Sequence, residues 1–530
     1  MVRPLDRRHR CWFRFLLCAV HAVLWSAWPP FPSTCDSLDV LREVQQLIQE
    51  NKLDRAETQL TAYLGKYPKE PVAHSFLGVI QAQQGKMEAA EASFKEAILY
   101  GPRMAGPYLN LGRLYLENAS RFPDAQQKAL TVYDQLLQFQ PDQVEAAYQT
   151  AVLLQHLGQF SKSQSRLARL PSAEQNRAQA LAVQLANRVK MNDTRQSHEL
   201  AARLVSSPDL VEPDVLSVLP FLDSHPALRV QLLEGLARRG LAGPLSWHQL
   251  GLAYEAENQW KEARQALERA AQGSPRLAVL LLDLARVAHK QGDLTGALGY
   301  LAHARDLKPG DPGIHFFFGM VCVEQNLPLE ARKSLEQAVK LDDGNPYYHY
   351  ALGAVLLQDR DPSLAIPQFE RFCQLLPDDI RGRFSLGVAY FYSSQYEPAR
   401  KQLEAVAADP RTAAAAQYFL ARVAKQAGNL DEATARLRSS LAANPDYAEA
   451  HAEMGLMHIR NKEYAEAEKS LRRALELDPE SYLANMNLLN LYQRTKDPRM
   501  AEQTQRFEEI KKKRSEEQQA LLRTIEVRPY

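Results

Sequence analysis

Histidine-containing motifs are the first candidates for chemistry in this sequence. Zinc peptidases hold their metal with two histidines one helical turn apart, and the glutamate after the first histidine acts as the base. His198 and Glu199 start such a motif, but Ala202 stands where the second histidine is needed. Gly-rich phosphate-binding loops and Gly-x-Ser-x-Gly turns are also missing from the sequence. The sequence therefore predicts no enzyme and no catalytic residue.

Three other histidines share one position in a repeating pattern. His315 and His349 lie 34 residues apart, and His451 falls on the same register. Side chains on helices about 8–10 Å apart can share a metal only with a further ligand between them, and none stands in place. We expect polar surface or groove residues here, and neither a metal site nor a bound cofactor.

The five cysteines do not form a site either. Their spacing fits neither a disulfide framework nor a zinc site of the Cys-x-x-Cys type. Cys322 and Cys373 fall in apolar helical patterns, and we expect both to be small buried thiols.

The composition indicates a folded protein without a polyanionic ligand. The 530 residues carry 64 Lys and Arg against 63 Asp and Glu, a formal net charge of +1. Chains that bind nucleic acid usually carry a large basic excess, so we expect no nucleic acid partner. Hydrophobic residues make up 45% and charged residues 24%, which excludes wholesale disorder.

An internal repeat organises most of the chain. Eight repeats start 34 residues apart, at 244, 278, 312, 346, 380, 414, 448 and 482, and earlier ones start near 37, 71, 105 and 144. A small residue recurs at the eighth and twentieth places, as at Gly353 and Ala365, and a proline often follows the second helix. Small residues let two antiparallel helices approach closely, and proline cannot continue a helix.

These markers resemble the tetratricopeptide repeat family, whose repeat is a helix-turn-helix. The pattern covers roughly 38–506. The resemblance implies an all-α fold, a right-handed superhelical solenoid of about fourteen repeats, two of them degenerate. It also implies that one face of the first helices lines a concave groove.

The stretch 172–243 departs from the pattern. It contains helix-like runs but lacks the small-residue markers, and prolines crowd its centre. Its length suits two repeats that start near Ala178 and Glu212. We expect two degenerate helix pairs that bend the array, and a flexible linker between two arrays stays open as the alternative.

The N-terminal residues 1–36 have the pattern of an export signal. Five arginines precede a short apolar run and a proline-rich segment. The apolar run is shorter than the about 20 residues of a membrane span, and the cleavage site is poor, so an uncleaved N-terminal anchor stays open. We expect an exported chain, in the periplasm, in the cell envelope or secreted.

The C-terminal residues 503–530 suit a polar capping helix, over 505–523, and a tail. The expected organisation is therefore a signal or anchor at 1–36, an N-terminal array at 37–171, degenerate repeats or a bend at 172–243, a C-terminal array at 244–502 and the cap at 503–530.

The fifth place of each repeat is the best candidate for ligand binding, because the family resemblance puts it on the concave side. Four consecutive repeats carry an aromatic ring there, and arginines lie close by. Such sets are typical of binding hot spots. We expect partly exposed rings, and rings that merely pack against the next helix stay open as the alternative. The predicted ligand-binding residues are His248, Arg286, Phe316, Tyr350, Arg383, Phe384 and Tyr418.

Together these features predict a non-catalytic protein–protein interaction scaffold in the cell envelope, which binds an extended peptide or a partner helix in its groove. Two alternatives stay open. One is an assembly factor for envelope polysaccharide or for protein secretion machinery. The other is an enzyme with its site in 172–243, built on Asp209, Asp214 or Asp223. Membrane association is expected only through the N-terminal segment.

Overall fold

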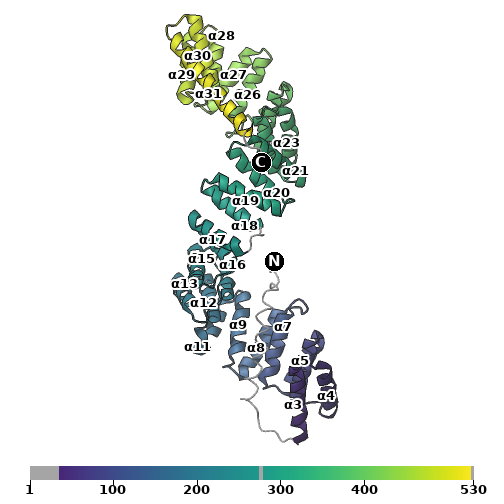
Figure 1. The fold of residues 1–530 in the computed structure, drawn as a ribbon. Helices are drawn as coiled ribbons and strands as arrows, with labels where there is room; N and C mark the ends of the chain where they lie inside the picture. The colour runs from purple at the N-terminus through teal and green to yellow at the C-terminus, as the bar shows by residue number, and fades with distance from the viewer. Residues whose placement is uncertain (1–34, 274–277, 527–530) are drawn as a thin grey trace. The chain divides into compact units, whose positions relative to one another are not determined.

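The computed structural model of the chain describes residues 35–273 and 278–526. Within these ranges the protein is built from α-helices and short turns, with one 3-10 turn and no β-strand. Figure 1 shows the helices following one another in pairs. The export signal predicted for 1–36 lies almost wholly outside the described residues. In the part of the chain that is described, no helix is both long and apolar enough to cross a membrane.

The chain divides into two compact bodies, 1–259 and 260–530. The N-terminal body contains α3 (Cys35–Gln49), α4 (Leu53–Lys66), α5 (Pro71–Gln83), α6 (Met87–Tyr100), α7 (Ala105–Glu117), α8 (Ala125–Phe139), α9 (Val144–His156), α10 (Phe160–Leu167), α11 (Ser172–Gln175), α12 (Ala178–Lys190), α13 (Thr194–Ser206), α14 (Glu212–Val218), η3 (Leu219–Phe221), α15 (Pro226–Arg238) and α16 (Pro244–Ala256).

The C-terminal body contains α17 (Trp260–Gly273), α18 (Ala278–Lys290), α19 (Leu294–Leu307), α20 (Pro312–Glu324), α21 (Pro328–Leu341), α22 (Pro346–Gln358), α23 (Pro362–Leu375), α24 (Ile380–Tyr392), α25 (Tyr396–Glu404), α26 (Ala413–Gln426), α27 (Leu430–Ala443), α28 (Ala448–Arg460), α29 (Tyr464–Leu477), α30 (Tyr482–Thr495) and α31 (Met500–Glu526).

The first helices of the repeats start where the repeat predicts. The helices from α16 to α30 that open a repeat begin at 244, 278, 312, 346, 380, 413, 448 and 482, so one start differs, by one residue. Local chemistry explains the sharp starts. Proline suits the first position because its missing N–H would be unpaired there, and a preceding Asp or Asn accepts a bond from the next free N–H. Asp311 accepts from the Gly313 N–H in this way, and Asn345 from Tyr347. The all-α repeat prediction is confirmed.

Close packing explains the small residues at the eighth place. A Cβ on Gly353 would lie 2.9 Å from the ring of Phe369, and a Cβ on Gly112 would lie 2.3 Å from the ring of Tyr133. Carbon atoms pack no closer than about 3.5 Å, so only glycine lets these second helices approach. Ala331 and Leu352 are buried, as expected for residues of the repeat core.

In many repeats, the side chain at the fourth place forms a hydrogen bond to the end of the preceding repeat. The Nε2 atom of His315 lies 2.9 Å from the carbonyl oxygen of Pro309, just beyond the preceding helix. The carbonyl six residues earlier is contacted in the same way by His74, Tyr108, His349, His451 and Asn485. His315 and His349 are only 8% and 3% exposed, so they are buried structural groups, and the expectation of surface or groove residues is wrong for them.

The stretch 172–243 folds into two helix pairs, with α12 and α14 starting at the predicted residues. Most of α12 is buried. A polar network joins it to the preceding repeat, since Gln155 donates to Asn187 over 2.9 Å and Asn187 donates to Ser163 over 2.8 Å. Buried amides cost little when each finds a partner, so this network replaces the usual small-residue packing. The structure thus describes packed helices here and not a flexible linker.

The last helix, α31, packs against α30 and starts before the predicted residue 505. Gln503 is buried and donates to the side-chain oxygen of Asn485 over 3.0 Å. The ring of Phe507 lies 5.0 Å from that of Tyr482. The helix therefore covers part of α30, which would otherwise face solvent.

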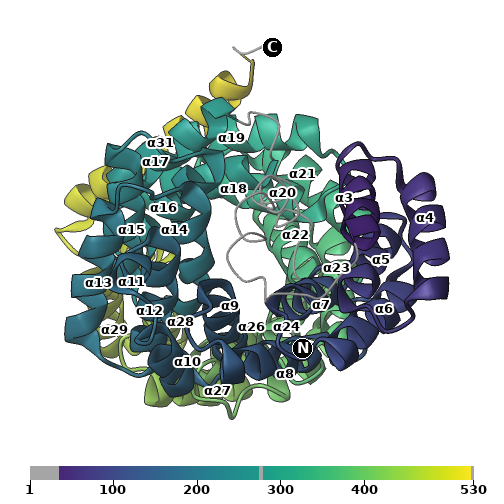
Figure 2. The same ribbon diagram turned by 90° about the horizontal axis from the view of Figure 1, so that it is seen from below.

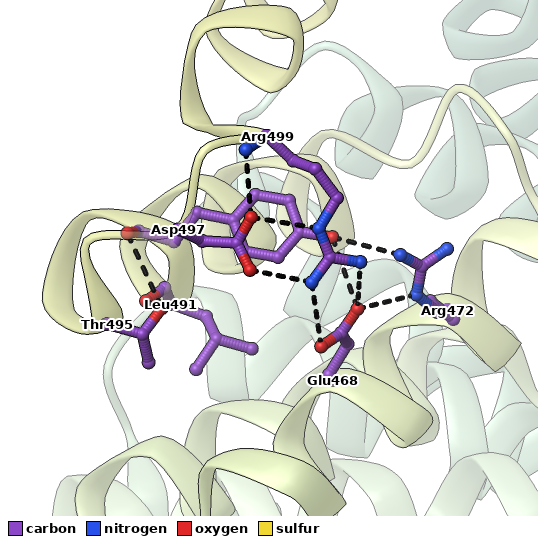
Figure 3. Close-up of polar contacts among 7 residues, drawn as sticks. Glu468, Arg472, Leu491, Thr495, Asp497 and Arg499 are labelled. Atoms are coloured by element: carbon purple, nitrogen blue, oxygen red, sulfur yellow. Dashed lines mark hydrogen bonds and ion pairs between the residues drawn. The ribbon is translucent and has the colours of Figure 1, made fainter.

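An ion-pair network holds the turn before α31 (Figure 3). Arg499 lies 2.6 Å from Asp497 and 2.7 Å from Glu468 of α29, and Glu468 also accepts from Arg472 over 2.8 Å. Pairs about one repeat apart recur along the body, as between Arg332 and Asp361 at 2.9 Å. Such exposed pairs fix local geometry and add little stability.

Candidate functional site

The candidate site lies on the first helices of the C-terminal body. The helices α20, α22, α24 and α26 contact one another in succession. Figure 2 shows first helices of this body, such as α22 and α28, in an inner row, with their partners α23 and α29 outside. We call the solvent side of α20, α22, α24 and α26 the first-helix face. Two tyrosines are exposed there, Tyr347 at 52% and Tyr392 at 54%.

The four predicted rings lie on these helices, and one of them is less exposed than expected. Phe316, Tyr350 and Phe384 are half-buried and pack against the cores of their repeats. Tyr418 is only 6% exposed, so the expected partial exposure is wrong for this ring. The reason is local crowding, because the rings of Phe419 and Tyr447 lie 5.3 and 5.5 Å from it.

The three predicted polar residues do not form one site. Arg286 of α18 is ion-paired with Asp283 at 2.7 Å. Arg383 of α24 is exposed. His248 is half-buried on α16, which belongs to the N-terminal body and not to the first-helix face. Among the predicted residues, Phe384 and Tyr418 are brought together through Phe419, whose ring lies 6.2 Å from Phe384. A role in ligand binding stays a prediction for all seven.

The structure centres the site on a residue outside the predicted set, Arg422 of α26. Its guanidinium carbon lies 4.5 Å from the ring centre of Phe391, and 5.6 to 5.7 Å from three further rings. The Arg422 cluster consists of Arg422, Phe391, Tyr392, Tyr418 and Phe419. The sequence holds a signal for it, because Arg422 follows Tyr418 by one helical turn.

The charges of this cluster stay fixed near neutral pH. Burial works against the charge of Arg422, but the neighbouring Tyr418 and the Tyr392 hydroxyl outweigh it and raise the pKa of the guanidinium. Burial raises the pKa of Tyr418 and raises that of Tyr447 to about 12. These hydroxyls therefore stay protonated and can donate hydrogen bonds. One turn further, Lys425 is ion-paired with the buried Glu453 at 2.7 Å.

The carboxylates considered for catalysis in 172–243 have structural partners. Asp209 accepts from the Ser207 hydroxyl and from the backbone N–H of Ala178. Asp214 accepts from the backbone N–H of Val211. Asp223 is exposed and lies 3.4 Å from Arg229. These contacts fix helix starts and turns, and they bring no acid and base together around a substrate.

The thiols and metal-binding side chains offer no reactive centre in the described ranges. Burial raises the pKa of Cys322 to about 12 and also raises that of the half-buried Cys373, so both stay thiols. No three His, Cys, Asp or Glu side chains within 35–273 and 278–526 gather as metal ligands would.

Comparison with family models decides the relationship of the chain. Two models, both described as tetratricopeptide repeat, match residues 41–108, 248–312, 384–435 and 420–482, and residues 288–355. Together they cover more than half of the sequence. The chain belongs to the tetratricopeptide repeat family.

Two curated relatives match only in part. Cellulose synthase operon protein C of Pseudomonas fluorescens is 28% identical over 98 residues, which are 18% of this chain and 7% of that protein. The BBSome complex member BBS4 homolog of Drosophila melanogaster is 23% identical over 276 residues, 49% of this chain and 56% of that protein. The chain thus matches about half the length of one relative and a small part of the other.

Solved structures of the same repeat type are also similar. Yeast Tom70 is 15% identical, with 88% of this chain and 100% of that one covered, at a TM-score of 0.35. YrrB, described as a protein of this family with an unusual peptide-binding site, is 20% identical, with 42% and 96% covered, at a TM-score of 0.27. Neither likeness bears on what this chain binds.

Proposed function

We propose that the chain is a non-catalytic scaffold that binds an extended peptide or a partner helix on the first-helix face. The observation that carries the proposal is the pair of exposed tyrosines, Tyr347 and Tyr392, beside half-buried rings and cations. Exposed aromatic side chains close to arginine are the usual anchors of protein interfaces.

The arrangement of these anchors suits a long, narrow ligand. Tyr347 lies at the start of α22, and Tyr392 lies at the end of α24, where its ring is 5.4 Å from that of Phe391. A ligand that crosses these two first helices can contact both tyrosines, and contacts in series add to useful affinity. Rigid helices hold these side chains in place before binding, which lowers the entropic cost.

The proposal includes no catalytic step, and the structural contacts of the acids of 172–243 support this. An enzyme with its site there is the weaker alternative. It predicts that Asp209→Asn or Asp214→Asn abolishes an activity, whereas the scaffold proposal predicts unchanged partner binding in both variants.

We place the scaffold in the cell envelope, on the strength of the arginine-rich and apolar pattern of 1–36. The partial similarity to cellulose synthase operon protein C favours a second candidate, an assembly factor for envelope polysaccharide or secretion machinery. N-terminal sequencing of the protein from its native cells tests the location. A mature chain that begins between 27 and 36 and lies outside the cytoplasm is expected, and Met1 in a soluble cytoplasmic fraction would contradict it.

Binding on the first-helix face is tested with peptides selected by display on the full chain. The double change Tyr347→Ala and Tyr392→Ala should weaken the selected peptides at least tenfold, because hot-spot aromatic side chains contribute about 2 kcal/mol each. Helicity should not change, since both side chains are exposed. Isothermal titration calorimetry measures the affinities.

A matched control is available on an outer helix. Tyr464 of α29 is 36% exposed, so Tyr464→Ala removes a surface ring of the same kind away from the first-helix face. Its affinity for the peptides should match that of the unchanged protein. Equal losses in the control and the double variant, or no loss in either, would place binding elsewhere.

A further inference from the structure

Arg422 is a half-buried cation whose neighbours are rings. Four aromatic rings surround its guanidinium within 6 Å. Among the described residues it forms no ion pair with a carboxylate. The buried carboxylate of Glu453, which acts on it at longer range, is ion-paired with Lys425. A guanidinium has five N–H donors in a planar fork, so the rings leave much of this capacity unused.

Two other arginines of the same body show what Arg422 lacks. Arg381 of α24 also lies over a ring, 5.7 Å from the centre of Tyr350, but it is ion-paired with Asp379 at 2.6 Å. Arg286 is ion-paired with Asp283. A carboxylate of the chain therefore neutralises Arg286 and Arg381, and the charge of Arg422 has no such partner.

Neutral donors stand beside this charge. The hydroxyl of Tyr392 borders the guanidinium, and Tyr418 and Tyr447 lie against each other next to it. Within the described ranges, no hydrogen-bond partner is found for the Tyr418 and Tyr447 hydroxyls. A fixed positive charge with phenol O–H groups around it favours a carboxylate, because charge-assisted hydrogen bonds are about twice as strong as neutral ones.

We propose that Arg422 anchors an acidic side chain of the peptide partner, so that the first-helix face selects extended segments with an Asp or Glu beside apolar residues. This inference rests on the proposed function. The carboxylate binds the guanidinium fork at Arg422, and the neighbouring apolar side chains of the peptide pack on Tyr392 and Tyr347. Because Lys425, Arg381 and Arg286 are paired, Arg422 is the cation of the Arg422 cluster that no carboxylate of the described chain neutralises, which suits a single carboxylate better than a polyanion.

One acidic residue of the chain competes with such a ligand. Glu449, exposed at the start of α28, acts electrostatically on both Tyr418 and Tyr447. Its negative charge repels a second carboxylate that approaches the same hydroxyls. Removal of this charge by Glu449→Gln should therefore strengthen binding of an acidic peptide and leave a neutral peptide unchanged.

The experiment uses the full chain and a displayed peptide whose binding the Tyr347→Ala and Tyr392→Ala changes weaken. Three forms of the peptide are compared by calorimetry: the parent, a form with its Asp or Glu replaced by the amide, and a form with an amidated C-terminus. We expect the amide side chain to cost the unchanged protein at least tenfold in affinity, and C-terminal amidation to cost less than twofold. A large loss only on amidation would overturn the assignment to a side chain.

The protein variants locate the anchor. Arg422→Gln should abolish the preference for the acidic form, Arg422→Lys should keep most of it, and Glu449→Gln should raise it two- to threefold. Arg381→Gln is the matched control and should leave the preference unchanged, because Asp379 already pairs with that charge. Should Arg422→Gln fail to fold, the Lys and Glu449→Gln variants still decide the question.

Two outcomes separate failure of this inference from failure of the proposed function. If the tyrosine variants weaken binding but Arg422→Gln keeps the full acidic preference, the face binds peptides and Arg422 is not the anchor. If the tyrosine variants leave every displayed peptide bound as before, the face itself is not the binding surface.

Discussion

Two arginines of the C-terminal body lie over aromatic rings but differ in whether a carboxylate of the chain pairs with them. Arg499 lies 4.7 Å from the ring centre of Tyr492, with Asp497 and Glu468 on its N–H groups (Figure 3). Arg422 lies 4.5 Å from the ring centre of Phe391, with further rings on its other sides. Arg499 therefore has both an aromatic ring and carboxylates of its own chain beside it. Arg422 has aromatic rings and the Tyr392 hydroxyl beside it, but no carboxylate of the described residues is paired with it.

The difference shows how a repeat array can use some arginines to hold its own structure and leave others for a ligand. A charge that meets a carboxylate at the surface gains little, because water and salt screen the pair, but it is no longer free for a ligand. A charge that is held by rings keeps its hydrogen-bonding edge free, and partial removal of water strengthens any ion pair formed there. Arg499, near the C-terminal end of the array, has the first arrangement, and Arg422 on the first-helix face has the second.

The largest change in stability should come from removal of the Phe391 ring, on which the Arg422 guanidinium lies. Phe391 is buried in a core formed with Ala399 and Leu403, so Phe391→Ala should cost about 3–5 kcal/mol of unfolding free energy. Hydrogen exchange should rise in α24 and α26 before other helices, because stability in repeat arrays is local. Mass-spectrometric exchange measures this directly.

The neighbouring residue is the control for that change. Tyr392 is exposed and follows Phe391 in the same helix, so Tyr392→Ala should change the unfolding free energy by less than about 0.5 kcal/mol. Comparable destabilisation by the two changes would mean that the cluster is a single core and that Tyr392 does not belong to a binding face.

A smaller effect is expected for Asp214, a carboxyl group without a cationic partner among the described residues. Burial raises its pKa to about 6, while one backbone N–H lowers it in part. The folded protein therefore holds this proton more tightly than the unfolded chain, whose Asp pKa is about 3.9. The resulting stability is complete below pH 4 and is lost as the pH rises through 6.

Asp214→Asn should accordingly stabilise the protein by about 1–2 kcal/mol at pH 7.5 and change little at pH 4. Urea unfolding of the variant and the unchanged protein at both pH values measures the difference. An equal gain at the two pH values would show that the carboxylate is ionised in the folded protein throughout this range.

The smallest effect should come from the ion-pair network at the end of the array. Arg499 holds the pKa of Glu468 below its usual value, so the pair stabilises the protein above about pH 4.5 and is lost as the pH falls below it. Glu468→Gln should cost about 1 kcal/mol or less at pH 7 and nothing at pH 3.

Salt gives the second readout for Glu468→Gln. In 1 M NaCl the thermal midpoints of the variant and the unchanged protein should coincide, since exposed pairs are screened over about 3 Å. A difference that survives both acid and salt would make Glu468 a packing residue, and the contrast with Arg422 would then not be one of charge.

The repeat was predictable from the sequence because its markers are packing rules. A small residue at the eighth place and a proline after the second helix each exclude alternatives locally, so the register of the repeats follows from residue type. The stretch 172–243 shows the limit. Its helix starts were also predicted, but the network of Gln155, Asn187 and Ser163 was not, because single hydrogen bonds between residues 32 and 24 apart leave no periodic signal.

The site was predictable in part and for the same reason. Aromatic rings at the fifth place were found by periodicity, yet their exposure depends on what the next helix places against them. Tyr418 is buried because Phe419 and Tyr447 happen to flank it. Arg422 is recognised as a candidate only in the structure. The sequence shows that it is a cation, but it does not show whether a carboxylate lies beside it.

The fourth-place hydrogen bond has a consequence for how such a chain changes over evolutionary time. This hydrogen bond spans only six residues, from the start of one repeat to the end of the repeat before it, as from His315 to Pro309. A duplication or deletion of one whole 34-residue segment would therefore present the same donor to the same carbonyl at the new junction. As far as this hydrogen bond is concerned, the array can lengthen or shorten in whole repeats, and the reach of its binding face can follow the size of its partner.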